Sequence, residues 1–298
     1  MATQAAVTFF YQSGFTAAVG KTLLIFSYWQ EHVPQELRLN DKDLRGFNNI
    51  IVFVPRASIE HNDPAVWQIS RGFPITYVAA GEAGSSVKDQ TGVRLVRQGE
   101  SLRVSNVQIT AYGSTDAGVS FMVKVSGIHI FHAGDLNLWH WREKNTLREI
   151  TRSEEEFYRV VSSINEDRID ICMFPVDPNL GGFYDAGANH FIMAKKPRLF
   201  FPMHFGQRSE IAQDYARRMH TAFTTVHALT QPRQTALIDF TVNPPVVRDS
   251  LSERKLLGRS TKAQEEERVS LSAYISDDPF SETDLPVDLP GAVRTAYA

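Results

Sequence analysis

The residues with the clearest potential for chemistry lie in the stretch 128–141, which reads Ile-His-Ile-Phe-His-Ala-Gly-Asp-Leu-Asn-Leu-Trp-His-Trp. Its first half alternates in the manner of a β-strand and then runs into Gly134-Asp135. A strand with this ending delivers a carboxylate at the edge of a sheet, where open α/β folds place their sites. Several histidines beside one aspartate are the residue types of a metal site. We therefore interpret His132 and Asp135 as a candidate site at a strand end.

Further apolar runs would position other polar residues in the same way. They predict buried strands over 6–11, 23–28, 49–54, 119–125, 169–176 and 198–203. The second strand brings Ser27 to its end, and the last delivers His204. Both residues are therefore placed where a functional side chain is expected.

Helix-start signals lie between these strands. Asp63 followed by Pro64 predicts that a helix begins there. Thr151 or Ser153 would cap a second helix that is rich in Glu at its start. A third helix is expected over 209–223. These helices would cover the predicted strands.

Composition and charge exclude several functional classes. The net charge of -3 argues against a general nucleic-acid binder, because phosphate neutralisation needs clustered Lys and Arg. No Lys or Arg precedes Lys21, so we expect no signal peptide, and no run of about 18 apolar residues predicts a membrane span. The single Cys172 lies in an apolar run and is expected in the core, without a disulfide. These features predict a cytoplasmic protein that binds neither nucleic acid nor a membrane.

The chain divides into residues 1–245, which hold the predicted strands, and a C-terminal extension over 246–298. In the extension, a charged helix is expected over 252–269, followed by an Asp- and Pro-rich segment over 276–290. A solvated tail is the simpler interpretation of that segment. The alternative is that it lies on another surface, either a protein partner or a second subunit of a homo-oligomer.

Four motifs carry a resemblance to a known family. They are His-Ala-Gly-Asp-Leu-Asn at 132–137 followed by Trp-His-Trp at 139–141, Gly-Ser-Thr-Asp-Ala-Gly-Val-Ser-Phe at 113–121, Pro-Val-Asp-Pro at 175–178, and Phe-Pro-Met-His-Phe at 201–205. In this order they resemble a bacterial branch of the metallo-β-lactamase-like hydrolases, over residues 6 to about 245. The resemblance implies an α/β protein with an αββα sandwich, in which two mixed sheets lie face to face with helices outside.

The sequence departs from that family where metals are bound. The family motif His-x-His-x-Asp-His follows the third strand, and the matching segment 56–61 reads Arg-Ala-Ser-Ile-Glu-His. Gln12 stands where the family has a histidine in the first turn, and Ser27 where it has an aspartate at the end of the second strand. The family site is therefore degenerate here.

The resemblance implies that one of the two family metals is lost and that the ligands of the other are largely kept. Arg56 abolishes the first site, because a guanidinium cannot be deprotonated to act as a ligand. The residues implied for the second site are Glu60, His61, Asp135 and His204. Two imidazoles and two carboxylates suit one divalent zinc, iron or manganese ion. Glu60 is one methylene longer than the family aspartate, which counts against this metal site.

Two roles remain open for Arg56. Its guanidinium could bind a phosphate or carboxylate of a substrate in a bidentate manner. Alternatively, it pairs with Glu60 or Asp135 and fills an emptied metal site, which is the interpretation that we favour. His140, between two tryptophans, is a second candidate for contact with a small-molecule substrate.

The sequence therefore leads to two functional hypotheses. In the first, the protein is a metal-dependent hydrolase of an ester, lactone or phosphoester, with Asp135 and His61 at the reaction centre of an at most mononuclear site. In the second, it is a catalytically inactive pseudo-hydrolase that serves as a binding or assembly protein, with a protein partner held through its C-terminal tail.

Overall fold

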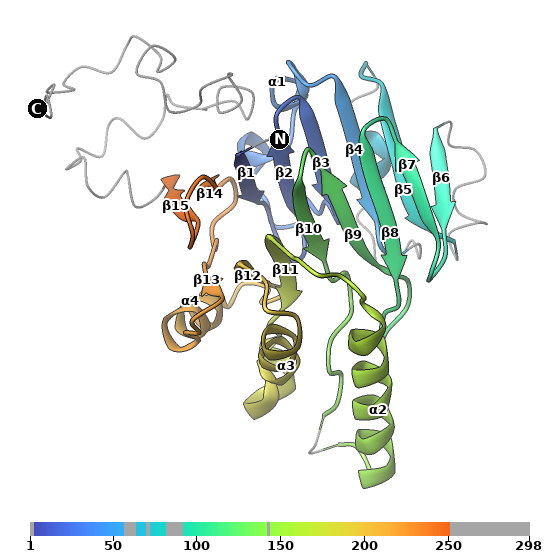
Figure 1. Ribbon diagram of the computed structural model, residues 1–298, viewed down its shortest axis with the longest axis vertical. Helices are drawn as coiled ribbons and strands as arrows, with labels where there is room; N and C mark the ends of the chain where they lie inside the picture. Colours follow the sequence, from blue (N-terminus) through green and yellow to red (C-terminus); the bar gives the residue numbers. More distant parts are fainter. Residues whose placement is uncertain (1–2, 57–63, 70–71, 82–91, 142–143, 251–298) are drawn as a thin grey trace, which may run out of the picture.

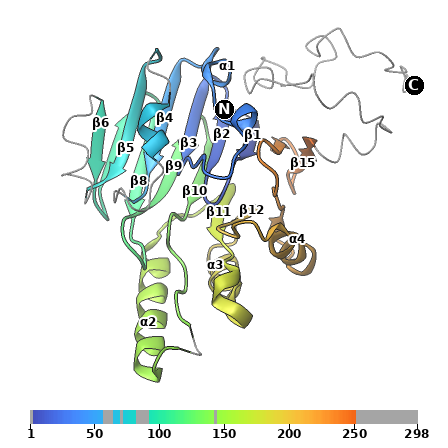
Figure 2. The same ribbon diagram turned by 180° about the vertical axis from the view of Figure 1, so that it is seen from behind.

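The computed structural model describes residues 3–56, 64–69, 72–81, 92–141 and 144–250, and two β-sheets lie face to face in it (Figure 1). Helices α2, α3 and α4 lie together beside the lower part of the second sheet, whereas α1 lies near the upper ends of the first sheet (Figure 1). The view from behind shows the first sheet in front of the second (Figure 2). The expected αββα sandwich is therefore confirmed.

The first sheet has eight strands in the order β15-β14-β1-β2-β3-β4-β5-β6. Their bounds are β1 Gln4–Phe9, β2 Phe15–Val19, β3 Thr22–Phe26, β4 Asn49–Val54, β5 Ile75–Ala80, β6 Val93–Val96, β14 Thr235–Asp239 and β15 Val246–Asp249. Strands β3 to β6 pair in parallel, and the remaining neighbours pair antiparallel. Strand β2 was not predicted from the sequence, and the turn at residues 12–14 joins it to β1.

The second sheet has seven strands in the order β13-β12-β11-β10-β9-β8-β7. Their bounds are β7 Ser101–Val104, β8 Val107–Tyr112, β9 Ser120–Val125, β10 Ile128–His132, β11 Ile171–Pro175, β12 Leu199–Met203 and β13 Thr225–Val226. Strands β10, β11 and β12 run parallel to one another. Their carboxyl ends therefore meet at one edge of the sheet, where residues 133–135, 176–177 and 204 follow.

The helices differ from the sequence predictions mainly at their ends. They are α1 Asp41–Leu44, α2 Leu147–Ser163, α3 Ala186–Lys195 and α4 Ser209–Arg218, with short 3₁₀ helices at Gln35–Leu37, Pro64–Gln68 and Pro178–Phe183. The prediction that Thr151 or Ser153 caps α2 is wrong. Thr146 caps it instead, because its side chain and that of Glu149 form a reciprocal capping box. The cap lies five residues before Thr151 and seven before Ser153, about one and a half to two turns earlier, in a stretch whose periodicity is the same.

Two other helix predictions are also corrected. The helix expected from Pro64 is a 3₁₀ helix that ends at Gln68. Helix α4 ends at Arg218 rather than at residue 223, because Met219 is extended and His220 forms a bridge with Thr225. The pairing of His220 with Thr225 of β13 therefore ends helix α4 before residue 223.

Aromatic side chains fill the space between the two sheets. Phe26 of β3 stacks on Phe53 of β4 at 4.6 Å between ring centroids, and Phe53 meets Phe121 of the opposite sheet at 5.1 Å. All three are fully buried. Burial of each such side chain contributes about 1.5–3 kcal/mol, so this column holds the sheets together. It also fixes the separation of the strand ends that carry polar residues.

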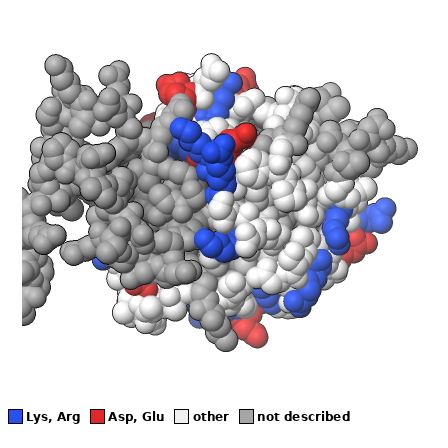
Figure 3. Space-filling model, turned by 90° about the horizontal axis from the view of Figure 1, so that it is seen from above, with Lys and Arg blue, Asp and Glu red and all other residues white. Residues whose placement is uncertain are grey.

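Strand β15 extends the first sheet beyond residue 245, where the sequence places the start of the C-terminal extension. The expected charged helix and the Asp- and Pro-rich segment lie outside the described residues. No helix in the described part of the chain is long and apolar enough to span a membrane. From above, the described surface shows separate groups of Lys and Arg with acidic residues beside several of them (Figure 3).

Candidate functional site

A cavity of about 150 Å³ lies where strands of the two sheets end. Its lining residues come from the segments that follow β1, β3, β4, β10 and β12, and they are Gln12, Ser13, Ser27, Trp29, Pro55, Arg56, Asp135 and His204. The structure thus brings together Arg56, Asp135 and His204, three of the residues that the sequence singled out. The two positions that depart from the family pattern, Gln12 and Ser27, line the same cavity.

The guanidinium of Arg56 joins two carboxylates at one side of this pocket. Its Nη1 donates to Asp116 Oδ2 at 2.8 Å and to Asp135 Oδ2 at 3.2 Å. The side chains of Arg56 and Asp135 are 18% and 19% exposed, so water screens this ion pair only in part. The pairing expected between Arg56 and Asp135 is therefore present. Asp116 was not foreseen, although it lies within the motif at 113–121.

Two glycine-dependent contacts hold the Asp116 loop against the end of β4. Gly118 has φ +91°, and a Cβ atom there would lie 1.9 Å from the carbonyl oxygen of Pro55. The next amide, Val119 N–H, donates to that same oxygen at 2.9 Å. Only glycine permits this approach, and it places Asp116 within reach of Arg56.

The same loop is tied to the segment that follows β10. Thr115 Oγ1 accepts from Asn137 N–H at 3.0 Å and donates to the Asn137 carbonyl oxygen. Trp139 then donates from Nε1 to the carbonyl oxygen of Asp135 at 2.7 Å. Its ring meets the His204 ring edge-on at 5.5 Å. The 132–141 stretch therefore positions the pocket mainly through Trp139 and backbone contacts.

His204 faces the pocket with one ring nitrogen engaged. Its Nδ1 lies 3.0 Å from Asp177 Oδ2, and because a carboxylate only accepts, Nδ1 carries the proton and Nε2 is left for the pocket side. Burial lowers the pKa of His204, but the hydrogen bond to Asp177 and the charges of Asp135 and Asp177 outweigh it, so the pKa is raised. Asp177 was missed as a site residue, although the Asp-Pro that follows a predicted strand marks its position.

Some buried hydrogen-bonding groups of the pocket have no partner among the described residues. They include the hydroxyl of Ser13, a residue that is 9% exposed, and the indole Nε1 of Trp29. A buried donor without a partner costs about 1–3 kcal/mol, and native structures contain few of them. These groups therefore point to a bound molecule or ordered water in the cavity.

Three pocket residues also have left-handed backbone conformations. Gln12, Ser27 and His204 have φ values of +54°, +45° and +66°. Each such non-glycine residue costs on the order of 1 kcal/mol or more, and such costs cluster at functional sites. The His204 amide donates to the Gln12 carbonyl oxygen at 3.1 Å, which couples two of these strained turns.

His132 is structural, which corrects its interpretation as part of the site. It is fully buried and stacks on Phe26 at 5.0 Å. Its Nε2 donates to the Ser13 carbonyl oxygen at 2.9 Å, and its Nδ1 accepts from Gly134 N–H at 3.1 Å. Burial lowers its pKa to about 4, against a smaller effect of the Ser13 bond. Both ring nitrogens are used, so neither can bind a ligand.

His140, predicted to contact a substrate, is not among the residues that line this cavity. It is buried, its Nε2 lies 3.8 Å from Glu154 Oε1, and its ring meets Phe183 at 5.7 Å. The arrangement packs the segment after β10 against α2 and the 3₁₀ helix at 178–183.

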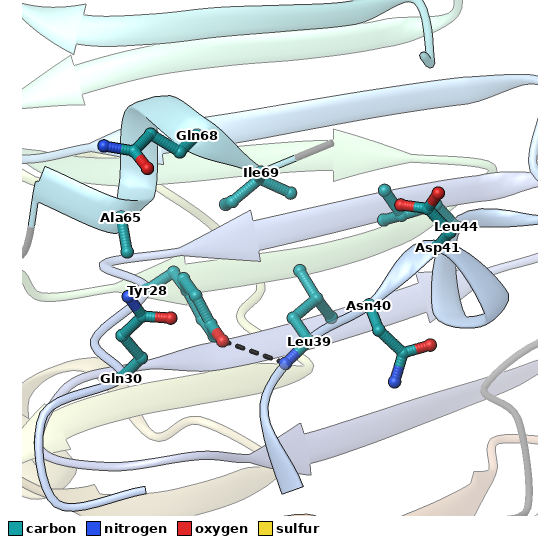
Figure 4. Close-up of a pocket in the computed structure, with 9 residues that line it drawn as sticks. All are labelled: Tyr28, Gln30, Leu39, Asn40, Asp41, Leu44, Ala65, Gln68 and Ile69. Atoms are coloured by element: carbon teal, nitrogen blue, oxygen red, sulfur yellow. Dashed lines mark hydrogen bonds between the residues drawn. The ribbon is translucent and has the colours of Figure 1, made fainter. Parts of the chain in front are cut away.

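A second cavity, of about 280 Å³, lies over the outer face of the first sheet and contains none of the predicted site residues (Figure 4). Its walls mix apolar side chains with the polar side chains of Gln30, Asn40 and Gln68, and the Tyr28 hydroxyl accepts from Leu39 N–H at 2.9 Å. Asp41 is the one charged side chain among its lining residues. The strand-end pocket is smaller, but Arg56, Asp135 and His204 all line it.

The donor set of the strand-end pocket does not fit the family's two-metal centre. Two predicted ligands, Glu60 and His61, lie outside the described residues. Within the part of the chain that is described, no three His, Cys, Asp or Glu side chains lie close enough together to hold a metal ion. Moreover, Arg56 already bonds Oδ2, one of the two carboxylate oxygens of Asp135. A single-metal site would depend on Glu60 and His61.

No protein-family model matches the sequence, and no curated protein matches it. Solved structures do match. Igni18, a novel metallo hydrolase from the archaeon Ignicoccus hospitalis KIN4/I, is 16% identical with a TM-score of 0.59, over 80% of this chain and 100% of that one. CmlA, a diiron β-hydroxylase from Streptomyces venezuelae, is 10% identical with a TM-score of 0.51, over 78% of this chain and 53% of that one.

The metallo-β-lactamase fold protein YhfI from Bacillus subtilis also matches, at 10% identity and a TM-score of 0.47, over 78% of this chain and 99% of that one. The matches to Igni18 and CmlA, whose TM-scores exceed 0.5, show the fold alone at such identities. With its two mixed sheets and outer helices, the chain has the metallo-β-lactamase fold, in agreement with the resemblance read from its motifs.

Proposed function

We propose that this chain uses the metallo-β-lactamase fold as a binding scaffold, in which the strand-end pocket takes one small polar molecule and Arg56 supplies the positive charge there in place of a metal ion. The observation that carries this proposal is the contact of 3.2 Å between Arg56 Nη1 and Asp135 Oδ2. A guanidinium keeps its charge at any physiological pH. A divalent ion at Asp135 would have to displace it or lie beside it against electrostatic repulsion.

The remaining pocket groups indicate the chemistry of the ligand. Trp29, Ser13 and His204 line the cavity and carry hydrogen-bond donors, in His204 when its second ring nitrogen is protonated. Asp135 supplies an acceptor. A ligand that suits both sides has a carboxylate for the donors and a hydroxyl for Asp135, which describes a small hydroxy acid. The cavity of about 150 Å³ has room for a molecule roughly the size of benzene.

Calorimetric titration of chelator-treated protein with glycolate, acetate and inorganic phosphate tests this proposal. We expect glycolate to bind more tightly than acetate, which lacks the hydroxyl. Trp29→Phe should weaken glycolate binding about tenfold or more, because a hydrogen bond to a charged group contributes about 1.5–3 kcal/mol. Trp67→Phe, a change outside the pocket, is the matched control. The proposal fails if none of the three probes binds, or if Trp29→Phe and Trp67→Phe bind equally well.

A metal-dependent hydrolase with one metal is the second candidate, and the pairing of His204 with Asp177 favours it. Histidines that bind metals usually donate their other ring N–H to a carboxylate, as His204 does here at 3.0 Å. In this case His61, Glu60 and Asp135 would complete the ligand set, and the metal would activate a water molecule for hydrolysis of an ester, lactone or phosphoester.

Elemental analysis of the purified protein separates the two candidates. The binding scaffold predicts no stoichiometric zinc, iron or manganese in the wild type. The Arg56→Gln variant, in which Asp135 is released, should gain affinity for Zn²⁺, and the gain should disappear in Arg56→Gln/Asp135→Asn. Stoichiometric metal in the wild type that is lost in a folded Asp135→Ala variant would instead favour the hydrolase.

A further inference from the structure

A groove of about 410 Å³ lies at the amino ends of β12 and β13, at the opposite end of β12 from His204. Its walls include Lys196, Arg198, Phe223 and the segment 243–245, and none of its lining residues is acidic. The groove shares no residue with the strand-end pocket. It is therefore a separate feature of the molecule.

The groove carries an excess of positive charge. Arg198 Nη1 donates to Asp170 Oδ1 at 3.2 Å, but this buried carboxylate is shared with Arg168, whose Nη2 lies 2.8 Å from Oδ2. The guanidinium groups of Arg168 and Arg198 thus share the single carboxylate of Asp170. Lys196 is exposed, and its ammonium lies 5.4 Å above the centre of the Phe223 ring. The wall therefore offers a cation beside an aromatic surface.

We propose that the acidic segment 276–290 of the same chain docks in this groove. The segment, Ser-Asp-Asp-Pro-Phe-Ser-Glu-Thr-Asp-Leu-Pro-Val-Asp-Leu-Pro, has five acidic residues and no Lys or Arg, which complements the charge of the groove. Its proline, phenylalanine and leucine side chains match the apolar surface of Phe223 and the prolines at 244–245.

The connection along the chain is long enough for this docking. Residues 243–245 line the groove, and β15, which follows them directly, spans only about 13 Å at its length of four residues. Twenty-five residues, 251–275, then lie between Ser250 and Ser276. Even at about 1.5 Å per residue, the rise of an α-helix, a connection of that length spans about 38 Å, well beyond the length of β15.

The fluorescence anisotropy of a dye attached to full-length protein at Ser281→Cys tests the proposal. Cys172 is buried, so the introduced thiol takes the label, and the protein without Ser281→Cys is the labelling control. We expect Lys196→Glu to lower the ratio of docked to free segment about fivefold, as the loss of one exposed ion pair implies. Lys144→Glu makes the same charge change at an exposed lysine that does not line the groove, and it should leave the anisotropy unchanged.

Charge exchange and dilution complete the test. Asp277→Lys with Asp278→Lys should restore the anisotropy in the Lys196→Glu background, and 0.5 M salt should lower it in the wild type. Equal anisotropy in the wild type and Lys196→Glu at low salt overturns the proposal. Anisotropy that falls on dilution of the protein also overturns it, because the segment would then dock on a second copy of the chain.

Discussion

His132 and His204 lie at the carboxyl ends of β10 and β12, two strands separated only by β11, yet the two ring environments are opposite. His132 is fully buried with both nitrogens bonded to backbone groups, and its pKa falls to about 4. His204 bonds a carboxylate through one nitrogen, keeps the other for a pocket, and has a raised pKa. The identity of the partner, backbone carbonyl or carboxylate, therefore decides whether a strand-end histidine is structural or chemically useful.

The largest effect expected from this contrast concerns stability. His132→Ala should lower the free energy of unfolding by about 4 kcal/mol, from lost packing and from the buried Ser13 carbonyl left without its donor. His204→Ala should cost less than about 1 kcal/mol, because its side chain is 29% exposed. Urea denaturation at pH 7.5 compares the two variants. Equal losses would remove the distinction between the two strand ends.

Lowering the pH should reduce the stability that His132 contributes to the fold. Its pKa is lowered on folding, so the stability it contributes is fully present above the unfolded pKa of about 6.5 and is lost as the pH falls toward about 4. Over this range the loss amounts to about 3 kcal/mol, at about 1.4 kcal/mol for each pH unit. NMR titration of the imidazole signals provides the check. A His132 signal that titrates near pH 6.5 in the folded protein would contradict the structural assignment.

The loop that carries Asp116 offers a third test, which concerns the residues around the pocket rather than His132. Gly118→Ala should cost about 2 kcal/mol, because the added Cβ meets the Pro55 carbonyl and the φ of +91° disfavours any other residue. It should also separate Asp116 from Arg56. Gly99→Ala is the control, since Gly99 has φ +85° but nothing within 4 Å of the added Cβ. A similar cost in both variants would assign the effect to backbone conformation alone.

The smallest effect concerns the charge of His204. Asp177→Asn should lower the pKa of His204, since the hydrogen bond and the charge that oppose burial are both weakened. In the wild type the raised pKa adds stability that is fully present below pH 6.5 and is lost as the pH rises through the folded value. Asp177→Asn should therefore destabilise the protein more at pH 5.5 than at pH 8.5. A pKa of His204 that is unchanged in NMR titration would show that Asp177 only packs against the ring.

Strand positions were predicted well where a buried run has a clear length and end. Strands β4, β10 and β12 were each predicted within two residues of their bounds, and these are the strands that deliver Arg56, Asp135 and His204 to the pocket. Strand β2 was missed, because Phe15–Val19 mixes alanine and threonine and follows a turn closely. The early start of α2 was missed because a cap about one and a half to two turns away fits the same periodicity.

By itself the sequence determined the strand ends at which polar residues gather, because alternation and strand termination are local properties of the chain. The αββα arrangement was expected only from the resemblance of its motifs to a known family. Only the tertiary structure decided what each of those residues does. His132 meets a carbonyl 119 residues away, and Arg56 meets a carboxylate 60 residues away. Hydrogen bonding and charge depend on such distant neighbours. For this reason two histidines of the same sheet edge, alike in the sequence, differ in burial, pKa and role.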